Sequence, residues 1–393
     1  MKKFFSSCLL SFTAGHIVNY SVIIYAQEVL RSDLLAGIGF GLCFGPPLLF
    51  GWYAGVLCDR HAPGRIIHFA QGLFIAAALT LAASDQLIAE ATARVPWVLL
   101  AASFAGIGWS FVAPARMTTL AQIADAAGLR RASLIFNLLV MLGFGLGPLA
   151  ISVCRLHFGW QGVFFLAAIL FALGSLLLLN VATRPSHKSY RPVGKEILEG
   201  LRAVRADPLL AQLLLMAIFG YMLMGPMQVI LPKLARASLG LSELGRGVFL
   251  GTLAPALIAG GLLCMLVARR LPHGKIIFAA AGLSGILFAA MSRMHAPATA
   301  FALLIGVGIL GGIAISLIVT GIQENVEDNL RGRVLSMYTI ISQVVPAASG
   351  LGAGALTYAL DARRAVLICG GTLAIAAALN AWRMHALRGY RGH

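Results

Sequence analysis

The chain has 393 residues, of which 59% are hydrophobic and 11% charged, with a formal net charge of +16. Globular proteins carry about 25% charged residues, so most of this chain is not suited to water. Its cations come in small groups between apolar runs rather than on one basic face. This pattern argues against a nucleic-acid-binding protein and is typical of a membrane protein.

The sequence gives no sign of an enzyme, a metal site or a bound cofactor. The six cysteines are scattered, with no Cys-x-x-Cys and no His/Cys group at metal-ligand spacing. No Ser/His/Asp or paired-carboxylate constellation falls at membrane depth. We therefore expect no catalytic residue, no metal and no cofactor.

Apolar runs long enough to cross a bilayer recur along the chain. The first follows Lys2 and Lys3 and continues to Ala26, too long for the apolar part of a signal peptide, so we expect an uncleaved span. A hydrocarbon core about 30 Å thick takes roughly 20 helical residues per crossing. By this measure twelve spans are predicted, at 5–27, 34–57, 66–84, 96–120, 132–154, 160–181, 208–231, 246–267, 275–293, 298–322, 334–359 and 364–385.

The longest polar interruption lies between the sixth and seventh spans. We therefore predict an all-α integral membrane protein with an N-terminal six-helix bundle at 1–182, a cytoplasmic central loop at 183–207 and a C-terminal six-helix bundle at 208–393. Placing the N-terminus in the cytosol puts 21 of the 30 Lys and Arg on the inner side. The positive-inside rule then predicts that both termini are cytoplasmic.

Two short basic connectors recur at about half the chain length. The segment 55–67 precedes the third span, and its Gly64 lies 210 residues before Gly274 in a similar segment. The segments 129–133 and 330–336 form a second such pair. A repeat of this kind indicates two similar membrane halves, which is one way to build a secondary transporter.

Gly55-x-x-x-Asp59-Arg60 after the second span, twelve spans and a long central loop resemble the major facilitator superfamily. Ser11-Phe12, Pro114-Ala115-Arg116 and the segment 330–336 resemble its bacterial subgroup of siderophore exporters, the enterobactin exporter among them, and macrolide efflux pumps. The resemblance implies a secondary active transporter of the bacterial inner membrane that works by alternating access.

We expect proton-coupled export of a siderophore-like or drug-like amphiphilic small molecule by a monomer in the lipid bilayer. An importer or a lysolipid flippase of the same fold remains the alternative. A transport-dead sensor is less favoured, because the longest loop has only about 26 residues and a domain needs at least about 50.

The resemblance also implies a cytoplasmic gate in which Asp59 latches the two halves, with Gly55 allowing close helix approach. Ala62 departs from the family motif, which has glycine there. From the charges we further predict one ion pair in each half, Asp59 with Arg116 and Arg269 with Glu324. A solvated Asp59-Arg60 loop pair is the alternative. The predicted gate residues are Gly55, Asp59, Arg60, Arg65, Arg116, Arg269, Arg270 and Glu324.

The fifth span contains Gly143-Phe144-Gly145-Leu146-Gly147-Pro148. Small residues permit tight helix packing, and proline allows a bend. The resemblance links a Gly-Pro element at this place to outward transport, so Gly143, Gly147 and Pro148 form a predicted exporter motif. Glycines that serve only helix packing are the alternative.

No acidic residue falls near the middle of a span, although such residues usually mark ion pathways. His16 in the first span and Glu28 at its outer end are therefore the candidates for proton coupling. If the fold follows the family, spans one, four, seven and ten line the cavity. Aromatic, methionine and amide groups there suit a neutral or anionic amphiphile. The predicted cavity residues are His16, Asn19, Trp109, Asn137, Tyr221, Met224, Gln228 and Gln343.

Overall fold

The structure is a computed structural model that describes residues 1–124, 128–179, 181, 183–184, 193–268 and 271–392. These residues are almost entirely helical, and they contain no β-strand. The helices are α1 (Lys2–Glu28), α2 (Asp33–Phe44), α3 (Pro47–Arg60), α4 (Pro63–Leu87), η1 (Thr92–Arg94), α5 (Val95–Ile123), α6 (Leu129–Leu178), α7 (Val193–Ala206), α8 (Pro208–Tyr221), α9 (Met224–Lys233), η2 (Leu234–Ser238), α10 (Glu243–Gly251), α11 (Leu253–Val267), α12 (His273–Ala290), η3 (Met291–Arg293), α13 (Pro297–Asn325), α14 (Asp328–Ala359), α15 (Ala362–Arg383) and α16 (His385–Gly389).

Within the described residues, 11 helical stretches are long and apolar enough to cross a membrane. The longest, Arg131–Leu178, has 48 residues, or about 72 Å at 1.5 Å per residue, more than twice the hydrocarbon thickness. It contains two of the predicted spans, and its helical geometry breaks at Gly159, where φ is 61° and ψ is −161°. The predicted all-α membrane fold is confirmed.

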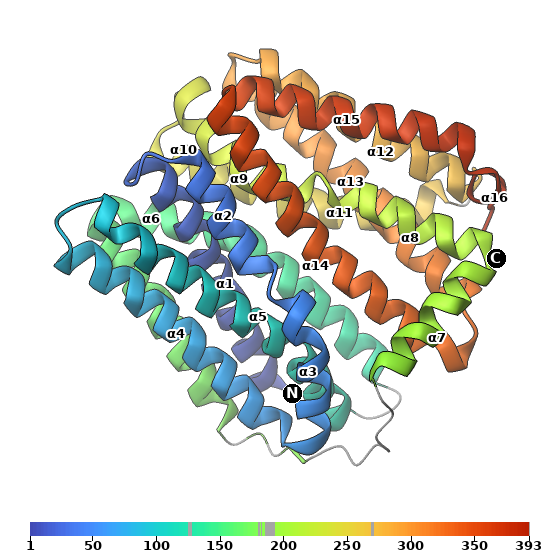
Figure 1. Ribbon diagram of the computed structural model, residues 1–393, viewed down its shortest axis with the longest axis horizontal. Coiled ribbons are helices and arrows are strands. Elements are labelled where there is room, and N and C mark those ends of the chain that lie inside the picture. The colour runs from blue at the N-terminus through green and yellow to red at the C-terminus, as the bar shows by residue number, and fades with distance from the viewer. Residues whose placement is uncertain (125–127, 180, 182, 185–192, 269–270, 393) are drawn as a thin grey trace. The chain divides into compact units, whose positions relative to one another are not determined.

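The helices group into two units by their contacts. The first unit holds Met1–Ser189 together with Ala235–Gly251, and the second holds Tyr190–Leu234 and Thr252–His393. The segment Ala235–Gly251, which carries α10, therefore packs with the helices of the first unit, mainly with α6. In Figure 1, α10 lies close to the ends of α1 and α6.

In the first unit, α1 is the most buried helix. It packs along α6 and against α2, while α4 packs between α5 and α6. Every residue from Ser11 to Ala26 is buried, including several polar ones, so α1 lies in the core of this unit. Stacked rings of Phe74 and Phe171, 4.6 Å apart, join α4 to α6.

In the second unit, α12 packs between α13 and α15, and α11 lies along α13. A Cβ atom at Gly260 would overlap the Ile309 carbonyl, so glycine allows these two backbones to touch. The amphipathic helix α7 covers part of α14, where Glu199 forms an ion pair with Arg333 at 2.6 Å. This helix occupies most of the predicted central loop.

Candidate functional site

Three of the predicted cavity residues meet in one aromatic cluster of the first unit. His16 is buried on α1, with its ring 5.6 Å from that of Trp109 on α5 and 5.1 Å from that of Phe144 on α6. The Trp109 indole N–H donates to Asn19 Oδ1 at 3.4 Å. His16 Nδ1 and Asn19 Nδ2 are buried without a hydrogen-bond partner. Buried polar atoms are usually paired, so these two are exceptions within the cluster.

The predicted exporter motif packs the back of this cluster. A Cβ atom at Gly143 would lie 2.6 Å from Phe12 Cβ, and one at Gly147 would lie 2.8 Å from His16 Cβ. Glycine at both positions lets α6 approach the backbone of α1. The Pro148 carbonyl oxygen lies 2.9 Å from the Cβ position of Gly247 on α10. The motif therefore contacts both α1 and α10.

Four of the other predicted cavity residues lie in the second unit. The hydroxyl of Tyr221 at the end of α8 is 2.7 Å from the hydroxyl of Tyr338 on α14. Gln228 is buried on α9 with its Oε1 unpartnered, while Met224 and Gln343 are half-buried. Asn137 lies in the first unit, exposed on α6, and does not belong to the aromatic cluster.

A ring of ion pairs ties α10 to α1 and α6. Glu28 on α1 accepts from Arg155 on α6 at 2.8 Å and from Arg246 on α10 at 2.5 Å. Glu243 on α10 pairs with the same two arginines, with Arg155 at 3.3 Å and with Arg246 within its own helix. Arg236 lies 3.5 Å from Glu28. We call Glu28, Arg155, Glu243 and Arg246 the ion-pair ring.

The ring is largely shielded from water, because its side chains are only 11–17% exposed. Arg155 also lies over the Trp160 ring, 4.3 Å from its centroid. Of the four residues of the ring, only Glu28 was predicted from the sequence to be functional. Two signals could have revealed the rest: an arginine between two apolar runs on the predicted outer side, and the Glu243/Arg246 spacing of three, which places both on one helix face.

Arg116 is fully buried on α5. Its guanidinium donates to Cys8 Sγ and Ser11 Oγ at 2.9 Å and to Ser7 Oγ at 3.3 Å, all on α1. No described acidic side chain pairs with it. The surroundings of Gly55, the side chain of Asp59 and the whole of Arg269 and Arg270 lie outside the described residues. The two predicted ion pairs therefore remain predictions.

The connector segment 55–67 and the end of α5 bind the residues that follow α6. The Gly64 N–H donates to Thr183 Oγ1 at 3.1 Å. The Gln122 side-chain amide donates to the Arg184 carbonyl at 2.8 Å and accepts from its N–H at 3.0 Å. We call Gly64, Gln122, Thr183 and Arg184 the first clamp. The predicted gate residues Arg60 and Arg65 are exposed near it.

A similar set of hydrogen bonds holds the C-terminal segment in the second unit. The Gly274 N–H donates to the Tyr390 carbonyl at 3.1 Å, and the Tyr390 hydroxyl donates to the Glu324 carboxylate at 2.7 Å. The Leu387 N–H donates to Gln212 Oε1 at 2.8 Å. We call these five residues the second clamp. Glu324, predicted to pair with Arg269, has Tyr390 as its described partner.

Comparisons with known proteins agree with this architecture. The family model described as Major Facilitator Superfamily matches residues 4–350. A comparison with curated proteins found no match. A bacterial homologue of the human lysosomal transporter Spinster, solved inward-facing and unoccupied, superposes with a TM-score of 0.76 at 17% identity, covering 98% of this chain and 97% of that one.

Two further solved structures are similarly related. A POT family transporter in complex with 5-aminolevulinic acid has a TM-score of 0.77 at 11% identity, covering 98% of this chain and 96% of that one. A mutant of the peptide transporter POT has a TM-score of 0.75 at 14% identity, covering 98% and 94%. The family match spans most of the sequence and the fold agrees throughout, so the chain belongs to the Major Facilitator Superfamily.

Proposed function

We propose that this chain is a proton-coupled exporter of a siderophore-like or drug-like amphiphile that works by alternating access in the bacterial inner membrane. The observation that carries the proposal is the ion-pair ring, which fastens the segment Ala235–Gly251 to α1 and α6. Ion pairs that become hydrated when they separate can be broken at modest cost, because water replaces the lost partners. The ring therefore serves as a latch at the predicted outer end.

The aromatic cluster supports an amphiphilic cargo. Trp109 and Phe144 contribute aromatic rings, and His16 and Asn19 each contribute a buried polar atom without a partner. Such a site suits a guest with flat apolar parts and a few hydrogen-bonding groups. His16 is the proposed proton carrier, since its imidazole can accept a proton and its Nδ1 has no hydrogen-bond partner. Identities of 11–17% to transporters of known structure support the fold only, so the cargo rests on the cluster and the sequence motifs.

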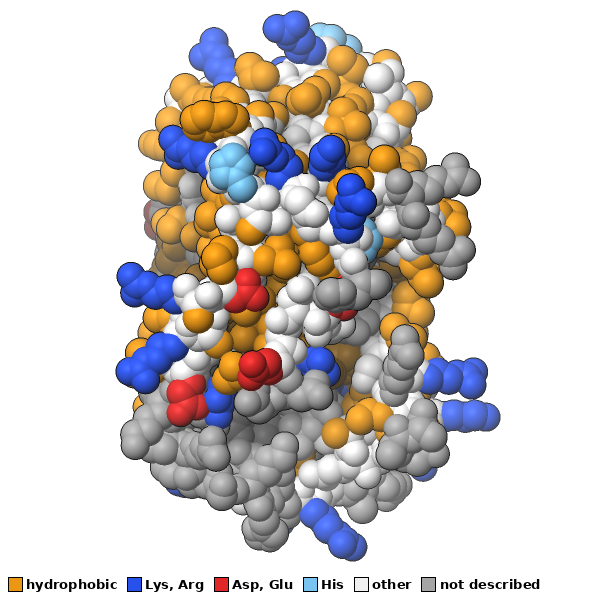
Figure 2. Space-filling view, turned by 90° about the vertical axis from the view of Figure 1, so that its right-hand side faces the viewer, with side chains coloured by type: hydrophobic (Ala, Val, Ile, Leu, Met, Phe, Trp, Pro, Cys, Tyr) orange, Lys and Arg blue, Asp and Glu red, His pale blue; other side chains and the backbone are white. Residues whose placement is uncertain are grey.

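Exposed cations support cytoplasmic termini. Lys275, Arg383, Arg388 and Arg391 are all exposed near the C-terminus, and Figure 2 shows Lys and Arg side chains gathered on this face. Cytoplasmic loops of membrane proteins carry an excess of these residues.

Transport can be tested in everted inner-membrane vesicles energised by respiration. We expect them to accumulate a catecholate siderophore or a macrolide, and to lose the accumulation with a protonophore. His16→Ala should abolish it, whereas His157→Ala, at an exposed histidine, should not. Accumulation only in right-side-out vesicles would indicate an importer, and activity unaffected by His16→Ala would remove this residue from coupling.

The latch has its own test through a native cysteine. Cys154 is partly exposed, carries a free thiol and immediately precedes Arg155. Arg246→Gln should speed its labelling by a membrane-impermeant thiol reagent, because α10 would part more readily from α1 and α6. Arg364→Gln is the matched control, since Arg364 pairs with Asp361 at the same spacing on α15. Equal labelling in both variants would contradict a latch.

A further inference from the structure

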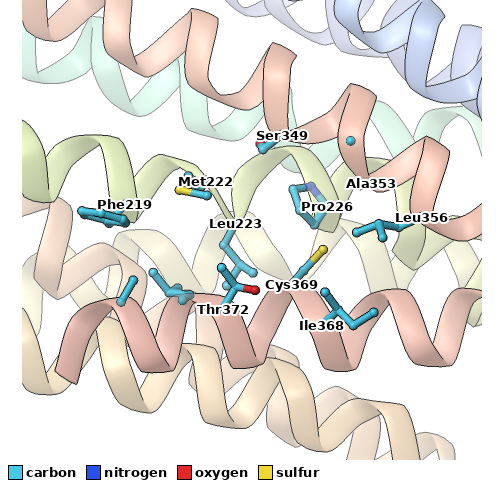
Figure 3. Close-up of a pocket in the computed structure, with 13 residues that line it drawn as sticks. Phe219, Met222, Leu223, Pro226, Ser349, Ala353, Leu356, Ile368, Cys369 and Thr372 are labelled. Atoms are coloured by element: carbon cyan, nitrogen blue, oxygen red, sulfur yellow. The ribbon is translucent and has the colours of Figure 1, made fainter. Parts of the chain in front are cut away.

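A cavity of about 210 Å³ lies within the second unit, between the joint of α8 and α9 and the helices α14 and α15. Figure 3 shows Leu223 and Pro226 in the middle, with Cys369 and Thr372 on α15 below them and Ala353 on α14 above. None of its 13 lining residues is charged. The hydroxyl of Ser349 is already engaged, donating to the Pro346 carbonyl at 3.2 Å.

The lining determines what the cavity can hold. An apolar cavity stays dry, because water there would lack the hydrogen-bond partners it needs. The volume is below the 300 Å³ or so of a site for a whole drug-sized ligand, so it suits a part of a molecule. Ile368 and Thr372 on α15 and Gly352 on α14 are exposed to the surroundings. For a membrane-spanning chain those surroundings are hydrocarbon, which can enter the cavity without crossing a polar barrier.

The cavity also adjoins a weak point in the fold. Helix α8 ends at Tyr221 and α9 begins at Met224. Because Pro226 has no N–H, the Met222 carbonyl loses the donor that a continuous helix would supply. Met222, Leu223 and Pro226 all line the cavity. In transporters, interrupted membrane helices commonly lie where the protein binds and moves.

We propose that this cavity binds one acyl chain of a bilayer phospholipid. The chain lodges between α14 and α15 and rests on Met222, Leu223 and Pro226. It thereby braces the joint of α8 and α9, so that bending at the joint requires the chain to shift or leave. This site is separate from the aromatic cluster and does not depend on the direction of transport.

Two glycines on the neighbouring helices allow a matched test. A Cβ atom at Gly352, which lines the cavity, meets no atom within 4 Å, and neither does one at Gly371 on α15, which does not line it. Gly352→Leu therefore fills the cavity without a backbone clash. Gly371→Leu adds the same side chain to a helix outside the cavity. Cys369→Leu enlarges a lining side chain from α15 and is a second filling variant.

The full chain would be placed in nanodiscs of a phospholipid whose acyl chain carries a photoactivatable diazirine. After illumination, peptide mapping locates the cross-links. We expect labelling of 219–226, 349–356 and 368–376 above that of the exposed α4 surface around Phe69. Gly352→Leu and Cys369→Leu should reduce it severalfold, and Gly371→Leu should not. Equal labelling of the wild type and the filling variants, or no excess over α4, would overturn the proposal.

Discussion

The two clamps perform the same task with different chemistry. In each unit, a connector glycine and a side chain near the end of a long helix hold one further segment, which follows α6 in the first unit and α15 in the second. Gly64 corresponds to Gly274 in this respect, and Gln122 on α5 corresponds to Glu324 on α13. The first clamp uses a neutral amide on exposed backbone. The second uses a carboxylate and a tyrosine that is 8% exposed.

This difference indicates that the stability of the second unit depends more on its clamp than that of the first. A Cβ atom at Gly274 would overlap the Leu387 carbonyl oxygen, whereas one at Gly64 would lie 3.0 Å from the Thr183 side chain. Backbone cannot move aside as a side chain can. Leu387 is fully buried, so the second clamp is part of the core of its unit. The first clamp lies nearer the surface.

The largest expected effect comes from Gly274→Ala. The added methyl group would force the C-terminal segment off α12, and overpacking of this kind typically costs about 1–3 kcal/mol. The apparent thermal midpoint in detergent should fall, and carboxypeptidase should trim the C-terminus faster. Gly389→Ala is the control, because a Cβ atom there meets nothing within 4 Å. Equal effects of both substitutions would show that α12 does not hold the segment through Gly274.

The sequence predicted the spans and singled out Gly64 and Gly274 through their spacing, because apolar length and a repeated connector are visible in the order of residues. It did not identify their partners. Thr183 lies 119 residues from Gly64 and is reached only through folding. The ion-pair ring as a set was not predicted for the same reason, because its members come from three helices that are far apart in the sequence. The hydrogen bonds from Arg116 to Ser7, Cys8 and Ser11 on α1 were not predicted either. The predicted pairing of Arg116 with Asp59 remains a prediction.

Tyr390→Phe should have the next largest effect. It removes the hydrogen bond to Glu324 and leaves the ring packed on His273, with the two rings 5.4 Å apart. A hydrogen bond to a partly hydrated carboxylate is worth about 1 kcal/mol. The thermal midpoint should fall, with Tyr358→Phe at an exposed tyrosine as the control. An unchanged midpoint would show that packing alone, without this hydrogen bond, holds the C-terminal segment in place.

The same bond predicts a pH dependence. Burial, and then the Glu324 carboxylate, raise the pKa of Tyr390 above its ordinary value. The folded state therefore favours the protonated phenol, and this stabilisation is fully present below the unfolded pKa of about 10. It declines as the pH rises through the folded pKa. The stability difference between the wild type and Tyr390→Phe should be constant from about pH 6 to 9 and diminish only in stronger alkali.

Gln122→Ala should have a smaller effect, because it removes two hydrogen bonds from an exposed site. Exposed hydrogen bonds exchange readily with water, so the expected loss is about 0.5 kcal/mol. Hydrogen exchange of the Arg184 amide, which donates to Gln122 Oε1, should accelerate, while the thermal midpoint changes little. Gln323→Ala on α13 is a control at an exposed glutamine. A loss of stability as large as that of Tyr390→Phe would show that the first clamp stabilises its unit as much as the second clamp does.

Gly64→Ala should have the smallest effect and tests the comparison most directly. Its methyl group would meet only Thr183 Oγ1 and Cγ2, at 3.0 and 3.9 Å, and a side chain can rotate away. Substitutions without a buried clash usually change stability by about 0.5 kcal/mol or less. Combining it with Thr183→Ala removes the contact and should restore the thermal midpoint of Thr183→Ala alone. If Gly64→Ala costs as much as Gly274→Ala and Thr183→Ala does not relieve it, the first clamp is as tightly packed as the second.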